Sequence, residues 1–258
     1  MPLTFPSHAA AVLPLMHIRG LPARALVVGS TAPDLVYLVG TLGATAHHPR
    51  GLLSVCLPAG VLAYLYLEAL VLPVVGPPLI SSWPDRGRAL VARLARPRPL
   101  PRSVRGWLAV GLAVLVGAAT HQLWDGFTHA WMWPARVLYP TTSVSLLGHP
   151  VLLSKVLQHG SSALGLVIVC VYLWRTTAAD ARPPTSRAAA VRRLAALLAG
   201  PLVVAGVAAC VRLRVPDPLL TRALWDAAWS AAAWSMLALG LVCLGVRCLD
   251  FARRQSHE

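Results

Sequence analysis

The membrane character of the chain is plain in residues 51–75, which read GLLSVCLPAGVLAYLYLEALVLPVV. Glu68 is the one acidic or basic residue in this stretch. At about 1.5 Å per helical residue, the stretch is long enough to cross a hydrocarbon core of about 30 Å. Residues 51–75 therefore predict a transmembrane helix.

Four further stretches are long and apolar enough to span a bilayer, namely 106–131, 151–174, 194–212 and 223–246. The whole chain is 57% apolar and only 12% charged, which is far from the average soluble protein. We therefore expect an all-α fold, a polytopic membrane helix bundle whose first partner is the lipid bilayer. Residues 1–258 should form one membrane domain.

The chain is strongly basic, with twenty-three Lys and Arg against nine Asp and Glu. In a soluble protein this balance would suggest nucleic acid as a partner. Here the arginines gather in the connections 76–105 and 175–193, as they do in cytoplasmic loops of membrane proteins. We therefore expect no nucleic-acid partner. The two connections and the tail from Arg247 should be cytoplasmic, with 132–150 and 213–222 outside.

All basic residues except Lys155 are arginine, and Ala, Gly and Pro are abundant. This composition suggests a GC-rich bacterial genome, and hence a multi-pass protein of the bacterial inner membrane. The composition does not indicate an oligomeric state.

Residues 1–46 do not fit a simple span. Residues 25–46 are long enough to cross the membrane, but Pro33 and Asp34 lie in the middle of them. A carboxylate and irregular backbone at membrane depth need a protein-lined cavity. The sequence leaves two alternatives open, five spans or six, with the first 46 residues packed as broken, partly re-entrant helices.

The sharpest polar motif is His121-Gln-Leu-Trp-Asp125-Gly-Phe-Thr-His129, at the expected outer end of the second span. Steps of four keep these three side chains on one stripe of a helix. Imidazole and carboxylate are typical zinc ligands. However, His121 and His129 would lie about 12 Å apart along a straight helix. Either Asp125 bridges two metal ions, or His129 does not bind the ion.

Other polar residues are expected on the same side of the membrane: His47 and His48 before the first span, and His149 and His159 around the start of the third. A second polar stripe, formed by Lys155, Gln158, His159 and Ser162, follows helical spacing. This stripe is either a seam between helices or a surface that faces a substrate. Glu68 lies deeper, and we expect it to neutralise an arginine near the inner surface.

The chain resembles the bacterial membrane family catalogued as domain of unknown function 4184. The resemblance covers roughly residues 1–175 and leaves the two spans in 194–246 without a recognised motif. It is carried by Ser7-His8, Ala32-Pro33-Asp34, His47 four residues before Gly51, Cys56-Leu-Pro58, the His121–His129 motif, and Leu157-Gln-His-Gly-Ser-Ser162.

More distantly, the order of His and Asp residues is similar to that of inner-membrane metal-dependent hydrolases and of the zinc-dependent phospholipase C and P1 nuclease group. That resemblance implies a ligand set for one or two divalent ions, with zinc expected: His8, Asp34, His47, His121 and Asp125. The chain departs in two ways from the secreted phospholipase C and P1 nuclease enzymes, and both departures argue against a complete three-metal centre. The second helical ligand pair of the secreted enzymes has no counterpart here, and the chain does not begin with tryptophan.

These residues predict a membrane-embedded metal-dependent hydrolase that opens to the outer face, with a phospholipid or another phosphoester as substrate. His129 or His159 would move the proton. The alternative is a non-enzymatic membrane protein whose polar cluster binds or transports an ion or small solute. The hydrolase hypothesis requires Asp34 and Asp125 to lie within about 8 Å of each other, with at least two imidazoles within about 5 Å of either.

Overall fold

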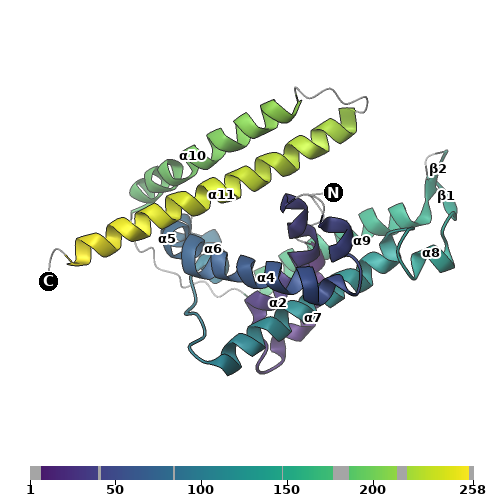
Figure 1. Cartoon of the computed structure of the whole chain (residues 1–258), viewed down its shortest axis with the longest axis horizontal. Helices are drawn as coiled ribbons and strands as arrows, with labels where there is room; N and C mark the ends of the chain where they lie inside the picture. The colour runs from purple at the N-terminus through teal and green to yellow at the C-terminus, as the bar shows by residue number, and fades with distance from the viewer. Residues whose placement is uncertain are drawn as a thin grey trace. The chain divides into compact units, whose positions relative to one another are not determined.

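The computed structural model describes residues 7–39, 42–83, 85–146, 148–176, 186–213 and 220–255. Regular structure among these residues is helical apart from one short hairpin, as the sequence predicts (Figure 1). The chain divides into two compact units. The first unit comprises residues 1–64 and 101–175, and the second comprises residues 65–100 and 176–258. The middle parts of the expected connections 175–193 and 213–222 lie outside the described residues.

Five described helices are long and apolar enough to cross a membrane, and each overlaps one of the predicted spans: Leu52–Ser82, Val104–Thr128, Leu153–Arg175, Arg187–Ala205 and Ala227–Ala252. The last four belong to α7 (Val104–Thr128), α9 (Leu153–Arg175), α10 (Arg187–Leu213) and α11 (Leu220–Gln255). The chain thus has the architecture of a multi-pass membrane protein.

The first span is not a uniform α-helix. Its four consecutive pieces are the π-helical η4 (Leu52–Cys56), α4 (Leu57–Leu65), the π-helical η5 (Tyr66–Val71) and α5 (Leu72–Ser82). Single π turns inside a helix are rare and occur often at functional sites. Both π segments carry a residue with a polar contact: Cys56 in η4 and Glu68 in η5.

The amino-terminal segment is a series of short helices, as its Pro33 and Asp34 predicted. They are α1 (Ala9–Val12), η2 (Pro14–His17), α2 (Ala23–Leu35), η3 (Val36–Val39) and α3 (Gly43–Ala46). Helix α2 has 13 residues, which makes it about 20 Å long and too short to cross the bilayer. Pro33 has no N–H for the last turn, and the chain continues as a 3-10 helix at Val36. Residues 25–46 therefore do not form a sixth spanning helix.

Helices α2 and α7 cross at two glycines in the first unit. A side chain at Gly29 would meet the Val114 carbonyl oxygen at 2.3 Å, and one at Gly117 would meet the Leu26 carbonyl oxygen at the same distance. The two backbones can approach closely only because neither glycine has a Cβ, as at other small-residue crossings in membranes. An apolar core beside the crossing consists of Ala32, Val36, Ala46, Val55, Cys56 and Ala118.

The expected outer connection 132–150 is partly ordered, which the sequence analysis did not predict. It contains α8 (Ala135–Leu138) and the first strand of an antiparallel hairpin, β1 (Ser143–Leu146) with β2 (His149–Leu152). Ser143 pairs with Leu152, and Leu146 pairs with His149. Gly148 lies between the strands with a φ of 83°, a conformation that glycine adopts without strain.

The second unit is held mainly by apolar packing. Helices α10 and α11 run side by side (Figure 1), and together with α5 they enclose a core of Val71, Val74, Val75, Leu197 and Cys243. The Tyr66 hydroxyl donates a hydrogen bond to the Met236 carbonyl. Helix α6 (Asp85–Ala95) packs on α5.

Candidate metal centre

Helix α7 supplies an imidazole and a carboxylate at one point near its end. His121 and Asp125 are 1% and 4% exposed, and they lie on the same stripe because they are four residues apart. Nε2 of His121 lies 3.2 Å from Oδ2 of Asp125. The predicted pairing of these two residues is therefore present in the folded chain.

His129 lies four residues after Asp125, about one helical turn, and contacts the same carboxylate. Helix α7 ends at Thr128, and His129 has an extended backbone with φ −119° and ψ 114°. The ring therefore folds back, and its Nδ1 lies 3.6 Å from Oδ2 of Asp125. This contact joins residues four positions apart, so the spacing of about 12 Å expected between His121 and His129 stays a prediction.

Asp34 reaches the cluster through the glycine crossing of α2 and α7. His121 Nδ1 donates a hydrogen bond to the Ser30 carbonyl at 2.8 Å, which leaves Nε2 facing Asp34 Oδ1 at 3.8 Å. Among the described residues, this buried Nε2 accepts and donates no hydrogen bond of good geometry. A metal-ligating histidine usually donates one ring N–H to a carbonyl or carboxylate and binds the ion with its other ring nitrogen.

His47 follows α3 and has the same arrangement. Its Nδ1 donates to the Gly43 carbonyl at 2.7 Å, and its Nε2 lies 3.5 Å from Asp34 Oδ1 and 3.4 Å from Asp125 Oδ2. The loop that carries it is held from α7 by Gln122, whose amide donates to the carbonyls of Ala46 and His48 at 2.7 and 3.0 Å. His47 is thus placed by backbone contacts rather than by apolar packing alone.

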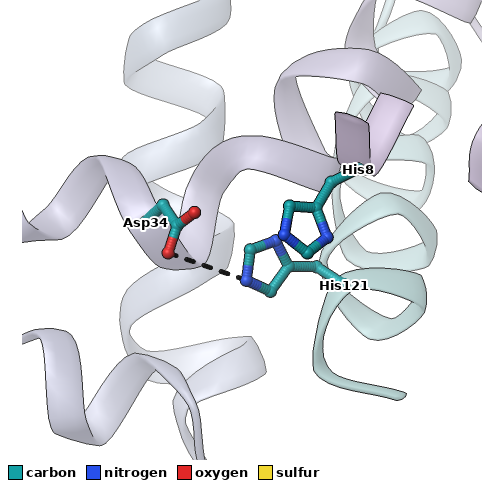
Figure 2. Close-up of side chains that lie close together, drawn as sticks. All are labelled: His8, Asp34 and His121. Carbon is teal, nitrogen blue, oxygen red and sulfur yellow. Dashed lines mark ion pairs between the residues drawn. The ribbon is translucent and has the colours of Figure 1, made fainter. Parts of the chain in front are cut away.

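His8 completes the cluster from the residue just before α1. Its ring stacks on His121 with centroids 3.9 Å apart, and its Nε2 lies 3.8 Å from Asp125 Oδ1. Figure 2 shows the His8 and His121 rings face to face with Asp34 opposite His121. Three segments distant in sequence thus meet with α7 at one buried point.

The five residues that the resemblance nominated lie together: His8, Asp34, His47, His121 and Asp125. Because His47 Nε2 contacts both carboxylates, Asp34 and Asp125 lie within the separation that the hydrolase hypothesis requires. Two overlapping groups could each hold an ion, and the ligand atoms within each group lie within 4.8 Å of one another. These groups are His8 with Asp34 and His121, and His47 with His121 and Asp125. The donor set of nitrogen and carboxylate oxygen suits zinc.

The charges of the metal-free cluster differ between two of its histidines. Burial and the nearby His121 lower the pKa of His8 to about 4, so His8 is neutral near pH 7. Burial alone would also lower the pKa of His47, but its contacts with Asp125 and Asp34 outweigh burial and raise that pKa to about 10. In the metal-free chain His47 therefore keeps a proton that a divalent ion would displace on binding.

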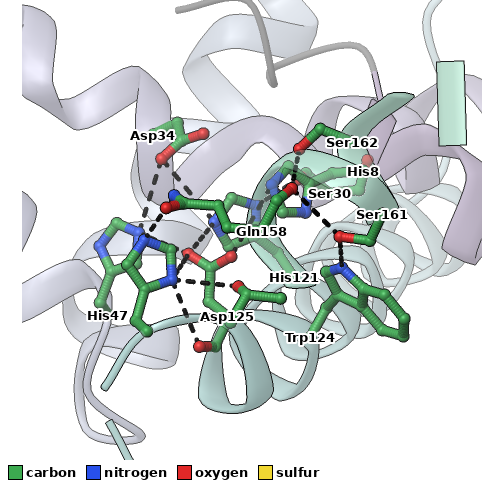
Figure 3. A network of polar contacts seen from close by, with 12 residues as sticks. His8, Ser30, Asp34, His47, His121, Trp124, Asp125, Gln158, Ser161 and Ser162 are labelled. Atoms are coloured by element: carbon green, nitrogen blue, oxygen red, sulfur yellow. Dashed lines mark hydrogen bonds and ion pairs between the residues drawn. The ribbon is translucent and has the colours of Figure 1, made fainter. Parts of the chain in front are cut away.

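Gln158 on α9 connects the polar stripe of that helix to the cluster (Figure 3). Lys155 donates to its carbonyl oxygen at 2.9 Å, so its amide nitrogen faces His129 Nε2, 3.0 Å away. His129 then accepts at Nε2 and carries its proton on Nδ1, the atom beside Asp125. This contact joins α9 to the segment that follows α7, and both alternatives for the stripe, a seam between helices or a surface that faces a substrate, stay predictions.

The remaining nominated residues lie elsewhere. His159, the second candidate for proton transfer, is exposed, and no contact with the cluster is found among the described residues. His48 and His149 are exposed as well. In the second unit, the Glu68 carboxylate accepts the backbone N–H of Arg98 at 2.8 Å. That contact involves the backbone of an arginine, and the neutralisation of Glu68 by an arginine guanidinium stays a prediction.

Three positioning features escaped the sequence analysis: the Ser30 carbonyl, the Gln122 amide and the Gly29/Gly117 crossing. A backbone carbonyl has no signature in sequence. Gln122 stands inside the His121–Asp125 motif, one residue after a ligand candidate, and its place there was the available signal. The glycines are two of nineteen in the chain, and spacing alone does not say which of them meet.

Comparison with known proteins identifies one family. The model of the family described as "Domain of unknown function (DUF4184)" matches residues 1–245. The match extends well beyond residue 175, so it includes most of the two last spans that the motifs left unassigned. No curated protein and no solved structure matches the chain.

Proposed function

We propose that this chain, which belongs to the DUF4184 family, is a membrane-embedded metal-dependent hydrolase acting on a phosphoester, with phospholipids as a candidate substrate class. One observation carries the proposal. Three imidazoles and two carboxylates converge at a buried point, and among the described residues the buried Nε2 of His121 makes no hydrogen bond of good geometry although Asp125 Oδ2 lies 3.2 Å away. Packing gives no reason for such a gathering, because ionisable groups in a low-dielectric site are unfavourable without an ion or proton to share.

His8, Asp34, His47, His121 and Asp125 would hold one or two divalent ions, with zinc the best match to their donor atoms. When bound, such an ion lowers the pKa of a water molecule and polarises the phosphoryl oxygen. Ser30 and Gly43 keep the imidazoles of His121 and His47 in the tautomer that points Nε2 inward.

Hydrolysis adds the oxygen of one water to phosphorus, breaks the bond from phosphorus to the leaving alcohol, and returns a proton to that alcohol. His129 is placed to handle the proton, because its Nδ1 lies beside Asp125 and Gln158 holds its other nitrogen. His159 is exposed and is the weaker candidate.

A cavity of about 340 Å³ beside His47 supports a phosphoester as the substrate. Its lining includes His47, Gln122, Trp131 and Arg136. The guanidinium of Arg136 offers charge and paired donors that match a phosphoryl group. A negatively charged ester could therefore approach the cluster through this cavity, with Arg136 balancing its charge.

The basic connections support an orientation in a bacterial inner membrane. With 76–105 and the carboxyl-terminal tail in the cytoplasm, the end of α7 that carries His121 and Asp125 opens to the extracytoplasmic face. In this orientation the site would act on substrates of the outer leaflet.

Metal content tests the proposal independently of activity. Elemental analysis of detergent-purified protein, prepared without chelators, should find one or two zinc, manganese or similar ions per chain. His121→Ala should lose them, whereas His159→Ala, which changes an exposed histidine, should keep them. Absence of stoichiometric metal from the wild-type protein contradicts the proposal, and bound metal without phosphoester hydrolysis favours the ion-binding alternative.

A further inference from the structure

An apolar groove of about 210 Å³ begins at the cluster and runs between α1, α7 and α9. His8, Ser7, Trp124 and Ser161 lie at its polar part, and Ala10, Ala11, Leu164, Gly165 and Ile168 form the rest of its lining. The groove therefore includes one of the nominated metal ligands. It is also separate from the cavity beside His47, whose lining shares no residue with it.

The α9 wall of the groove is a single stripe. Ser161, Leu164, Gly165 and Ile168 follow helical spacing and extend over about 10 Å of the helix. A side chain at Gly165 would meet the Ser7 carbonyl oxygen at 2.8 Å, so the missing Cβ lets α9 approach the segment that carries His8. The groove is thus lined by the segment that carries His8 on one side and by α9 on the other.

The outer side of this wall has the surface of a lipid-facing helix. Leu164, Val167, Ile168 and Val171 are all exposed on α9, which is long and apolar enough to span the membrane. A groove edged by such a face opens sideways to hydrocarbon. An alkyl chain could enter it from the bilayer without passing through water.

We propose that this groove holds one acyl chain of a membrane lipid whose phosphoester lies at the cluster. The proposal rests on the hydrolase function above and narrows its substrate to amphiphiles with an acyl chain. Two observations argue for this occupant: the lining of the groove includes the nominated ligand His8, and it also includes Leu164 and Ile168, which are exposed on the apolar face of α9.

Photolabelling tests the groove without relying on hydrolysis. The probe is a phosphatidylglycerol whose acyl chain ends in a diazirine, mixed into phosphatidylcholine nanodiscs that hold the full chain. Labels should concentrate on Ala11, Leu164 and Ile168. Ala11→Phe, which fills the groove, should reduce this labelling about five-fold or more, and Ile168→Phe gives an independent blocking variant. Val167→Phe adds the same ring to the exposed face outside the groove and should leave labelling unchanged. Equal labelling of groove residues, Val167 and Val171 overturns the proposal.

If the groove holds an acyl chain, hydrolysis should depend on chain length. Kinetic measurements with a long-chain and a short-chain substrate that share a headgroup test this. Ala11→Phe should lower kcat/KM for long-chain phosphatidylglycerol about ten-fold while leaving the short-chain analogue unchanged, because only the long chain uses the groove. Equal loss for both substrates overturns the groove as an acyl site. If the wild-type protein hydrolyses neither, the hydrolase function is wrong, and labelling alone then decides whether the groove binds a lipid chain.

Discussion

The two units of the chain differ in what they bury. The first unit buries His8, His47, His121 and Asp125 against one another, whereas the described core clusters of the second unit consist of valine, leucine, isoleucine, alanine and cysteine side chains. The second unit also buries an acid, Glu68, but a backbone N–H binds its carboxylate. A buried charge can therefore be structural, and the first unit is distinguished by several ionisable groups sharing one point.

Asp125→Asn should have the largest effect on this contrast. Asp125 contacts His8, His47, His121 and His129, and the change removes the negative charge while keeping the size of the side chain. Loss of a residue that only orients a metal ligand typically costs about 10–100-fold in metal affinity or activity. Asp125 is itself a nominated ligand, so we expect metal affinity and hydrolysis to fall by more than about a hundred-fold. Isothermal titration with zinc and a phosphodiester assay measure this. Unchanged metal affinity would show that the cluster is not a metal centre.

Substitution of single glycines should separate the close crossing of α2 and α7 from open helix surface by the sign of the effect. In Gly117→Ala, the new Cβ would lie 2.3 Å from the Leu26 carbonyl oxygen, so α2 and α7 must move apart. We expect a destabilisation of about 1–3 kcal/mol together with weaker metal binding. In the second unit no atom lies within 4 Å of a Cβ at Gly245 on α11, and Gly245→Ala should be neutral or stabilising by about 0.5–1 kcal/mol.

Thermal unfolding in detergent, followed by circular dichroism, compares the two glycine variants. Gly160→Ala is a control within the first unit, because its Cβ would also meet no atom within 4 Å. If Gly117→Ala were as stable as Gly160→Ala, the close crossing would not be what positions His121 against Ser30.

Gln122→Met should have a smaller effect that is confined to metal binding. The substitution keeps the length of the side chain but removes the amide that holds the carbonyls of Ala46 and His48. His47 would be less firmly placed, and we expect zinc affinity to fall about ten-fold with little change in helicity. Gln158→Met is the matched control, since Gln158 contacts His129 rather than the His47 loop. Equal zinc affinity in wild type and Gln122→Met would contradict the positioning role.

Much of the fold was predictable because membrane spans need only length and apolar composition. All five predicted spans overlap helices of the required length, and Pro33 marked the break in the amino-terminal segment. The β1–β2 hairpin was missed because its strands are only four residues long and mostly exposed, which leaves a weak periodic signal.

The candidate site was predictable only in its residue types. The spacing of His121 and Asp125 predicted their common stripe, whereas His8, Asp34 and His47 were nominated by resemblance. Their convergence depends on a helix crossing and on loop contacts to the carbonyls of Ser30, Gly43 and Ala46. His129 contacts Asp125 but belongs to neither candidate metal group, and its part in the site stays a prediction.

Glu68→Gln should have the smallest effect, and it sharpens the comparison because it is the same chemical change as Asp125→Asn made in the other unit. Glu68 is 2% exposed, so the two acids are buried to a similar degree. A carboxamide oxygen can still accept the Arg98 N–H, and the loss of charge on the acceptor should cost about 1 kcal/mol or less. Metal content should stay at the wild-type level, because a buried carboxylate binds an ion only where other ligands lie beside it. The Glu68 carboxylate instead accepts a backbone N–H. A loss of metal as large as that of Asp125→Asn would mean that the second unit takes part in binding, and the division of roles between the units would then be wrong.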